Sequence, residues 1–314
     1  MKIKIFSIVI LIMFLFGYSI TFVSSSSNLK SVNDSDWYYL PGYPNYAPSG
    51  LPDFSQLQQK DWWGHKYPDC CGAVSLANVL WWFDSKNEDI NGFPGDGNNT
   101  YPLVQDYCPL GIPNPGPNSD DHNFNNVNDN QTSFPIIGGT GELIERIAFY
   151  TNRQKNTLLP KFLGPFNGPY NALMLYLGAN KWFRKSGLKN QYSIKVKIKP
   201  KFSFIDECVR NNKGVILGLL GYDPEVEPFG TIWGHFVAVA GVNSSGKIAF
   251  SDPVRDRLNP SLDPAEHNNA SIVSHDIYNI SLDSPWPLIS DCFLPNYSKE
   301  SVYIPLAIVI SQIE

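Results

Sequence analysis

Charged residues are scarce in this sequence. Asp, Glu, Lys and Arg make up 17% of its 314 residues, and the formal net charge is −5. No basic cluster stands out against this acidic balance, which excludes a nucleic-acid partner because phosphate binding needs a positive surface. After the N-terminal segment, no stretch is long and apolar enough to span a bilayer. The eight Trp, sixteen Tyr and nineteen Phe predict instead a well-filled core and aromatic surface grooves.

The N-terminus reads as an export segment. A short basic start at Lys2 and Lys4 precedes the apolar stretch Ile5–Val23, and small residues follow it. This pattern predicts a signal peptide over residues 1–25. The length of the apolar stretch also fits an uncleaved N-terminal membrane anchor. In either case we expect a secreted or extracellular protein that touches a membrane only if this segment stays attached.

The cysteine count is odd. An exported chain with five cysteines favours disulfides, but at least one thiol is left over unless it pairs between chains. We expect Cys108 and Cys292 to lie in a surface disulfide, and Cys208 to pack as a small apolar side chain. Asn-x-Ser/Thr sequons fit a glycoprotein where the host glycosylates proteins. They begin at Asn33, Asn98, Asn130, Asn243, Asn269, Asn279 and Asn296.

Three regions follow from composition. We expect residues 1–25 to be the export segment, residues 26–50 to be a linker or extended arm rich in Ser, Asn, Tyr and Pro, and residues 51–314 to form one domain. Within that domain, residues 91–140 are rich in Asn, Gly, Pro and Asp, and we expect a long insertion there. Its oxygen-bearing residues lack the Gly that a helix–loop–helix calcium site needs at its sixth position, so we expect a solvated loop.

The remaining pattern predicts a helical half followed by a mostly antiparallel sheet, which is an α+β arrangement. The helix from Cys71 to about Asp84 is apolar nearly all round, so we expect it to be buried on most sides. Residues 255–298 look irregular and polar. Further helices are expected over 141–151, 169–185 and 202–211, and strands over 192–198 and from 215, 235, 247 and 302.

Of the two adjacent cysteines, Cys71 is the better nucleophile. It stands at the start of the buried helix, where free N–H groups and the helix dipole stabilise a thiolate. Gly72 leaves room for a substrate backbone, and its N–H can point at a developing oxyanion. Cys70 lies one residue further out and follows Asp69, whose negative charge disfavours a thiolate. The other reading of Cys71 is a buried structural thiol.

His235 is the histidine with the context of a base. It begins the apolar strand HFVAVAGV, which runs to Val242 and has the small residue Gly234 before it, whereas the other four histidines lie in loop contexts. The turn NSSG at 243–246 joins this strand to KIAFSD, which ends at Asp252. In an antiparallel hairpin the start of one strand lies beside the end of its partner. Asp252 is therefore expected to accept a hydrogen bond from the imidazole and fix its tautomer.

These segments carry a family resemblance. The stretches CGAVSLANVL from Cys71, GHFVAVAGV from Gly234 and KIAFSDP from Lys247 resemble the papain-like cysteine peptidases of the bacteriocin-leader-processing, double-glycine peptidase-like type. The resemblance implies a papain-like fold, with Cys71 as nucleophile, His235 as base and Asp252 as orienting residue. It covers mainly residues 51–86 and 212–254.

The chain departs from that family's pattern at two positions. Ala73 stands where the family has Pro, which a helix tolerates because Ala is a good helix former. The oxyanion glutamine is expected about six residues before the cysteine, where this chain has His65. The segment LPDFSQ resembles the lead-in that carries this glutamine, so Gln56 is the first candidate and Gln58 the second.

The sequence thus predicts an exported cysteine peptidase, or a related thiol acyl-transferase, that acts on a peptide or protein substrate. No cofactor is expected. No metal site is expected either, because the only neighbouring Cys or His residues are Cys70 and Cys71, and adjacent residues rarely serve one closed zinc site. The alternative function is a non-catalytic extracellular binding or surface module on the same fold.

Overall fold

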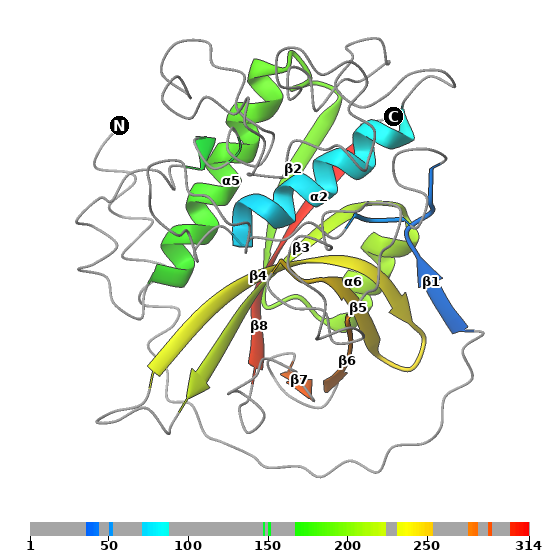
Figure 1. The fold of residues 1–314 in the computed structure, drawn as a ribbon, viewed down its shortest axis with the longest axis vertical. Coiled ribbons are helices and arrows are strands. Elements are labelled where there is room, and N and C mark those ends of the chain that lie inside the picture. The colour runs from blue at the N-terminus through cyan, green and yellow to red at the C-terminus, as the bar shows by residue number, and fades with distance from the viewer. Residues whose placement is uncertain are drawn as a thin grey trace, which may run out of the picture.

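Two long helices lie beside a curved antiparallel sheet in the computed structural model of the chain (Figure 1). The structure describes residues 36–43, 50–52, 71–87, 147, 150–151, 167–223, 231–253, 276–281, 288–290 and 302–313. The fold class over this part of the chain is α+β, as the sequence predicts. No helix within these ranges is long and apolar enough to cross a membrane.

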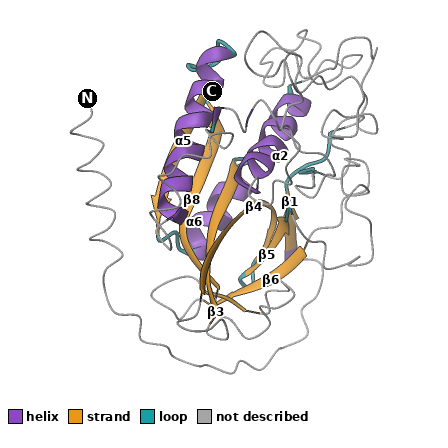
Figure 2. Cartoon of the chain, turned by 60° about the vertical axis from the view of Figure 1, so that its left-hand side comes forward, coloured by secondary structure: helices purple, strands orange, loops and turns teal. Residues whose placement is uncertain are grey.

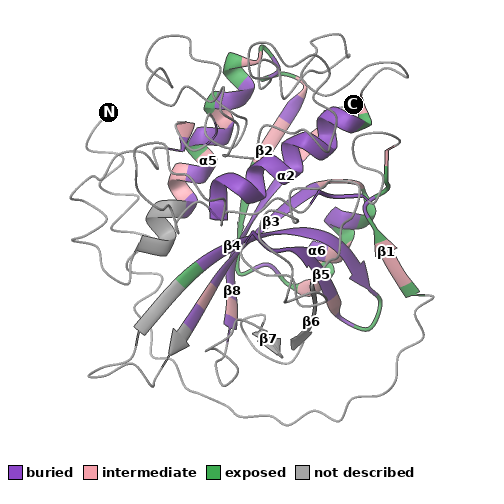
Figure 3. Ribbon diagram, in the orientation of Figure 1, coloured by how far each residue is buried: buried purple, intermediate pink, exposed green. Residues whose placement is uncertain are grey.

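The three helices with full bounds differ in how they are covered. They are α2 (Cys71–Lys86), α5 (Asn167–Lys185) and α6 (Phe202–Arg210). Every residue of α2 from Cys71 to Ser85 is buried, which the nearly all-apolar sequence predicts, whereas α5 has an exposed outer side (Figure 3). Helices α2 and α5 stand side by side above the strands (Figure 2).

The strands form one sheet in which all pairings are antiparallel. They are β1 (Trp37–Tyr39), β2 (Tyr192–Ile198), β3 (Gly214–Asp223), β4 (Thr231–Asn243), β5 (Lys247–Ser251), β6 (Asp276–Ser281), β7 (Leu288–Ser290) and β8 (Val302–Gln312). Their order is β1-β4-β3-β8-β7-β6-β5, with β2 beside β8. Because β5 also pairs with β4, the pairings return to β4, and the sheet curls around its own core.

Close packing of α2 on β3 fixes the helix on the sheet. A Cβ atom added to Gly214, at the start of β3, would lie 2.3 Å from Val79 Cγ1 and 3.1 Å from Phe83 Cε2. Only glycine therefore fits at this crossing. Trp81 and Trp82 on the same helix are fully buried. This packing fixes the distance between α2, which begins at Cys71, and the strands of the sheet.

The turn between β4 and β5 has the expected position. Asn243 Oδ1 accepts hydrogen bonds from the Ser245 backbone N–H, at 2.6 Å, and from the Ser245 hydroxyl. Gly246 closes the turn with a φ of +89°, which glycine adopts without strain. Since Asn243 is completely buried, the sequon that begins there is not a surface glycosylation site in the folded protein.

Most expected elements match the structure, with shifts of a few residues at their ends. Strand β2 has the predicted bounds, and α6 ends one residue before the predicted end at Asn211. Strand β4 begins at Thr231, before the start predicted at His235. In the helix expected over 141–151, Ile147 and Tyr150 are helical, and most of the others lie outside the described residues. The insertion expected over 91–140 also lies outside them.

Two polar segments supply strands that the sequence pattern did not predict. Residues 255–298 were expected to be irregular, but they supply β6 and β7, which join β5 to β8 in the sheet. Part of the linker or extended arm expected over 26–50 is strand β1, whose residues pair with the end of β4. These three strands depend on pairing with other strands, which local composition does not reveal.

The β1 segment is tied to three elements of the domain. Leu40 N–H donates to Ala240 O at 2.9 Å, and Leu40 is buried. The Tyr38 hydroxyl donates to Asn212 Oδ1 at 2.7 Å, directly after α6. Trp82 Nε1–H of α2 donates to Pro41 O at 2.9 Å. This segment is therefore part of the folded domain.

Candidate active site

Cys71 is the first residue of α2, as the sequence predicts, and it is 6% exposed. At this position the sulfur lies beside backbone N–H groups that have no acceptor within the helix, which favours a negative charge. A Cβ atom added to Gly72 would lie 3.3 Å from Phe236 Cδ2 and 3.4 Å from Leu175 Cδ2. The start of α2 therefore lies against β4 on one side and α5 on the other.

His235 lies on β4 and Asp252 directly follows β5. The two strands pair in antiparallel register, with Ala238 opposite Ser251, so the side chains meet across the end of the hairpin. His235 Nε2 lies 2.7 Å from Asp252 Oδ1. The contact predicted from the seventeen-residue separation is present in the structure.

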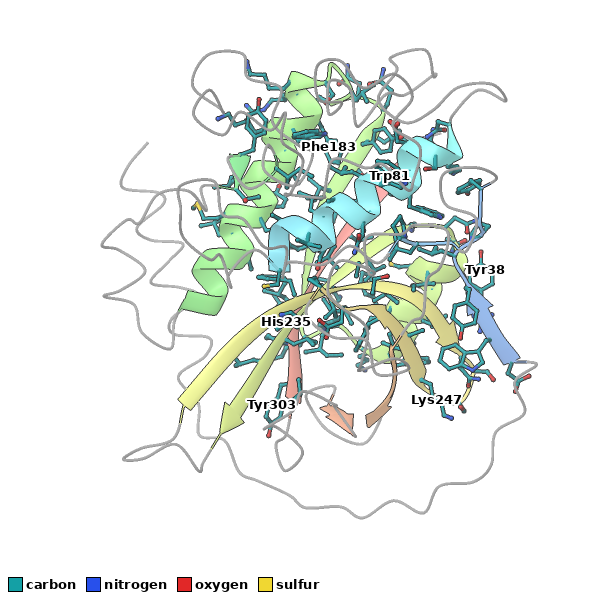
Figure 4. The ribbon with its side chains drawn as sticks, viewed as in Figure 1. Tyr38, Trp81, Phe183, His235, Lys247 and Tyr303 are labelled. Atoms are coloured by element: carbon teal, nitrogen blue, oxygen red, sulfur yellow. The ribbon has the colours of Figure 1, made fainter. Side chains whose placement is uncertain are left out.

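The imidazole also forms a side-chain hydrogen bond with Cys71. Because Nε2 is engaged by Asp252, Nδ1 is the ring nitrogen left for the sulfur. Figure 4 shows His235 where β4 passes the start of α2. The structure thus brings Cys71, His235 and Asp252 together from three separate segments, in the order that the sequence predicts.

The charges of the site favour a protonated imidazole. Burial alone would lower the pKa of His235, because it disfavours the charged ring. The negative charge of Asp252, its hydrogen bond, and the hydrogen bond and charge of Cys71 act in the opposite direction and raise this pKa from 6.5 to about 10. At neutral pH the site therefore holds an imidazolium between a carboxylate and a sulfur, which is the arrangement that stabilises a thiolate.

The three side chains of the site are buried. Cys71, His235 and Asp252 are 6%, 8% and 3% exposed, so their charges interact in a poorly screened environment. The neighbouring Gly234 is exposed. As a glycine it adds no side chain of its own beside the imidazole.

The other predicted residues divide into two groups. Cys208 is buried on α6 and is not in a disulfide, and burial raises the pKa of its thiol. It packs as a small apolar residue, as expected. Cys71 is likewise not in a disulfide. The remaining predictions, for Gln56, Gln58, Cys70, Cys108 and Cys292, fall outside the described residues.

Ser75 is a site neighbour that the sequence prediction missed. Its hydroxyl donates to the backbone oxygen of Phe236 at 3.0 Å, one residue after His235. Ser75 is completely buried. Its signal in the sequence is a polar side chain four residues after Cys71 in a mostly apolar helix, which places both on one face.

No protein-family model matches this chain, and no curated protein is significantly similar to it.

Proposed function

We propose that this chain is an exported cysteine peptidase with a papain-like fold, acting on a peptide or protein substrate. The observation that carries the proposal is the unbroken contact from Asp252 through His235 to Cys71 at a helix N-terminus. Nucleophile, base and orienting residue in hydrogen-bond reach of one another are the requirement for thiol-dependent acyl transfer. The resemblance in the segments around these three residues points the same way.

Each residue has a defined step in the proposed reaction. The Cys71 thiolate attacks the substrate carbonyl carbon and forms a tetrahedral intermediate. The His235 imidazolium then gives its proton to the leaving amine, which leaves a thioester on Cys71 and a neutral imidazole. That imidazole takes a proton from water, the hydroxide attacks the thioester, and the acid product leaves with the thiolate restored. Asp252 holds the ring in the orientation that both steps need.

The oxyanion of the tetrahedral intermediate needs hydrogen-bond donors. The backbone N–H of Cys71 is one of the first of α2, which have no acceptor within the helix. A glutamine side chain from the preceding segment supplies the second donor, with Gln56 as the first candidate and Gln58 as the second. Replacing each by Ala separates them, because removal of one oxyanion donor lowers kcat by about 10²-fold or more.

Hydrolysis of a synthetic peptide mixture, followed by mass spectrometry, tests the proposal. The wild-type protein is expected to cleave at least one peptide, and the Cys71→Ser and His235→Ala variants to cleave none. Cys208→Ser is the matched control, since it removes another buried thiol and should remain active. The alternative, a non-catalytic binding module, predicts that peptides bind to the wild type without cleavage and without a covalent acyl intermediate.

A further inference from the structure

Helix α2 and strand β4 meet beside the candidate active site. Cys71 and Ser75 are separated by four residues, so they lie one turn apart on the same face of α2. The Ser75 hydroxyl donates to Phe236 O at 3.0 Å, and Phe236 directly follows His235 on β4. The helix that carries the sulfur is thereby bonded to the strand that carries the imidazole, one helical turn from Cys71 and one residue from His235.

This bond lies where β4 has less support from the sheet. Strand β5 pairs with β4 from Ala238 to Asn243, whereas β3 pairs with it from Thr231 to Ala238. Among the described strands, the part of β4 around His235 and Phe236 therefore has β3 as its neighbour but not β5. The contact with α2 at Ser75 supplies a further restraint at this place.

The bond connects two groups that must keep a short separation. A proton passes between Cys71 and His235 only within hydrogen-bond distance, and a displacement of about 1 Å can lower a catalysed rate by about 10²-fold. Cys71 follows any movement of α2, and His235 follows any movement of β4. Val79 at Gly214 fixes the helix on β3 two turns away, so Ser75 provides the nearer link between helix and sheet.

The geometry points to Ser75 as a positioning residue of the active site, whose hydroxyl holds the Cys71 sulfur at hydrogen-bond distance from the His235 ring. This inference rests on the proposed function and deepens it. Ser75 does not touch the reacting atoms. It acts through the backbone of Phe236, and it therefore affects the formation of the thiolate–imidazolium pair and kcat more than substrate binding.

The chain offers a matched control on the same helix. Ser85 is also buried on α2, and its hydroxyl donates to Trp81 O at 2.8 Å, within the helix itself. Ser75→Ala and Ser85→Ala each remove one buried hydroxyl from α2, so both should lower stability by a similar amount. Only Ser75→Ala breaks a bond to β4.

The experiment measures kcat, KM and the pH dependence of Cys71 alkylation by iodoacetamide in the full chain. For Ser75→Ala we expect kcat to fall by about 10-fold or more with KM little changed, as misplacement of reacting groups predicts. The acid limb of alkylation should move to higher pH, since a displaced imidazolium stabilises the thiolate less. Ser85→Ala should retain the wild-type kcat and alkylation profile. Identical kcat and profiles in the two variants would overturn the inference.

Two further results keep this test separate from that of the proposed function. If the wild-type protein neither hydrolyses peptides nor is alkylated at Cys71 at mildly acidic pH, the proposed function itself is wrong. If Ser75→Ala does not fold, Ser75→Thr is measured, because it keeps the γ-oxygen. A wild-type alkylation profile in Ser75→Thr supports the positioning role, and a folded Ser75→Thr protein with a shifted profile contradicts it.

Discussion

His235 uses its Nε2 atom to contact Asp252 Oδ1, at 2.7 Å, and this leaves Nδ1 for the sulfur of Cys71. Asp252, which directly follows β5, therefore sets the orientation of the imidazole ring. In the neutral ring, a proton kept on Nε2 by the carboxylate leaves the Nδ1 lone pair facing the thiol. This tautomer is the one that can accept the proton of Cys71.

Replacing Asp252 tests how this orientation works. In Asp252→Ala the charge and the acceptor are both lost, so the pKa of His235 falls from about 10 as burial prevails. The alkaline limb of kcat/KM should move to lower pH, with a loss of about 10²-fold or more. Asp252→Asn keeps an oxygen acceptor without the charge, and we expect it to lose less activity while its alkaline limb also moves down. Unchanged alkaline limbs in both variants, measured on full pH–rate profiles, would contradict this account.

The raised pKa of His235 also predicts how stability varies with pH. A group whose pKa is higher in the folded state binds its proton more tightly there, so it stabilises the fold below its unfolded pKa of about 6.5. That contribution is lost as the pH rises towards and through about 10. The difference in Tm between wild type and His235→Gln should therefore shrink between about pH 6.5 and pH 10.

Calorimetry of both proteins across this range is the measurement. The comparison with His235→Gln removes the contribution of other titrating groups, because these are shared by the two proteins. A Tm difference that stays constant or grows with pH would show that His235 is not held as a buried imidazolium.

The contact between α2 and β3 gives a prediction about the fold. Gly214→Ala places a Cβ atom 2.3 Å from Val79 Cγ1, so the helix must shift away from the strand. Overpacking of this kind costs about 1–3 kcal/mol in unfolding free energy. Since α2 carries Cys71, the shift should also lower kcat.

A double-mutant cycle with Val79→Ala checks the cause. Val79→Ala removes the clashing methyl group, so the double variant should be more stable than the sum of the two single effects predicts, by about 0.5 kcal/mol or more. Denaturant unfolding of the four proteins gives the four free energies. If the two changes in unfolding free energy are additive, the destabilisation by Gly214→Ala does not come from its contact with Val79.

The parts of the site that sequence could predict share a local cause. The side-chain contact of Asp252 with His235 could be predicted because the turn at Asn243–Gly246 brings the start of one strand beside the end of the next, and hairpin geometry is local. Cys71 was found because a helix start beside a glycine is visible in the sequence. The bond from Ser75 to Phe236 joins residues far apart in the chain, and nothing in the local pattern specifies which backbone oxygen the hydroxyl meets.

The missed strands have the same explanation. Trp37–Tyr39 is too short to show a period, and its pairing with β4 depends on Gly241, where an added Cβ would lie 2.5 Å from Tyr39 Cδ1. Strand β6 carries polar residues and gains its place from pairing with β5 and β7. Pairing with other strands decides the place of both, and the composition of these segments alone does not reveal it.

Cys71 and Cys208 provide a direct test of what makes the candidate nucleophile reactive. Both are buried and neither is in a disulfide, so burial alone does not distinguish them. Cys208 lies on α6, where burial raises the pKa of its thiol, and it has no imidazole partner in the interactions that set that pKa. Cys71 has the helix N-terminus and the His235 imidazolium beside it.

At about pH 5 an ordinary thiol is almost fully protonated, whereas a thiolate held by an imidazolium persists. Iodoacetamide at this pH should therefore label Cys71 and leave Cys208 unmodified in the folded protein, as peptide mapping would show. Cys71→Ser should remove the label and Cys70→Ser should retain it, because consecutive residues at a helix start do not face the same way. Equal labelling of Cys71 and Cys208 would mean that access, rather than the charge of His235, controls the reaction. A label that disappears in Cys70→Ser and persists in Cys71→Ser would move the nucleophile to the preceding residue.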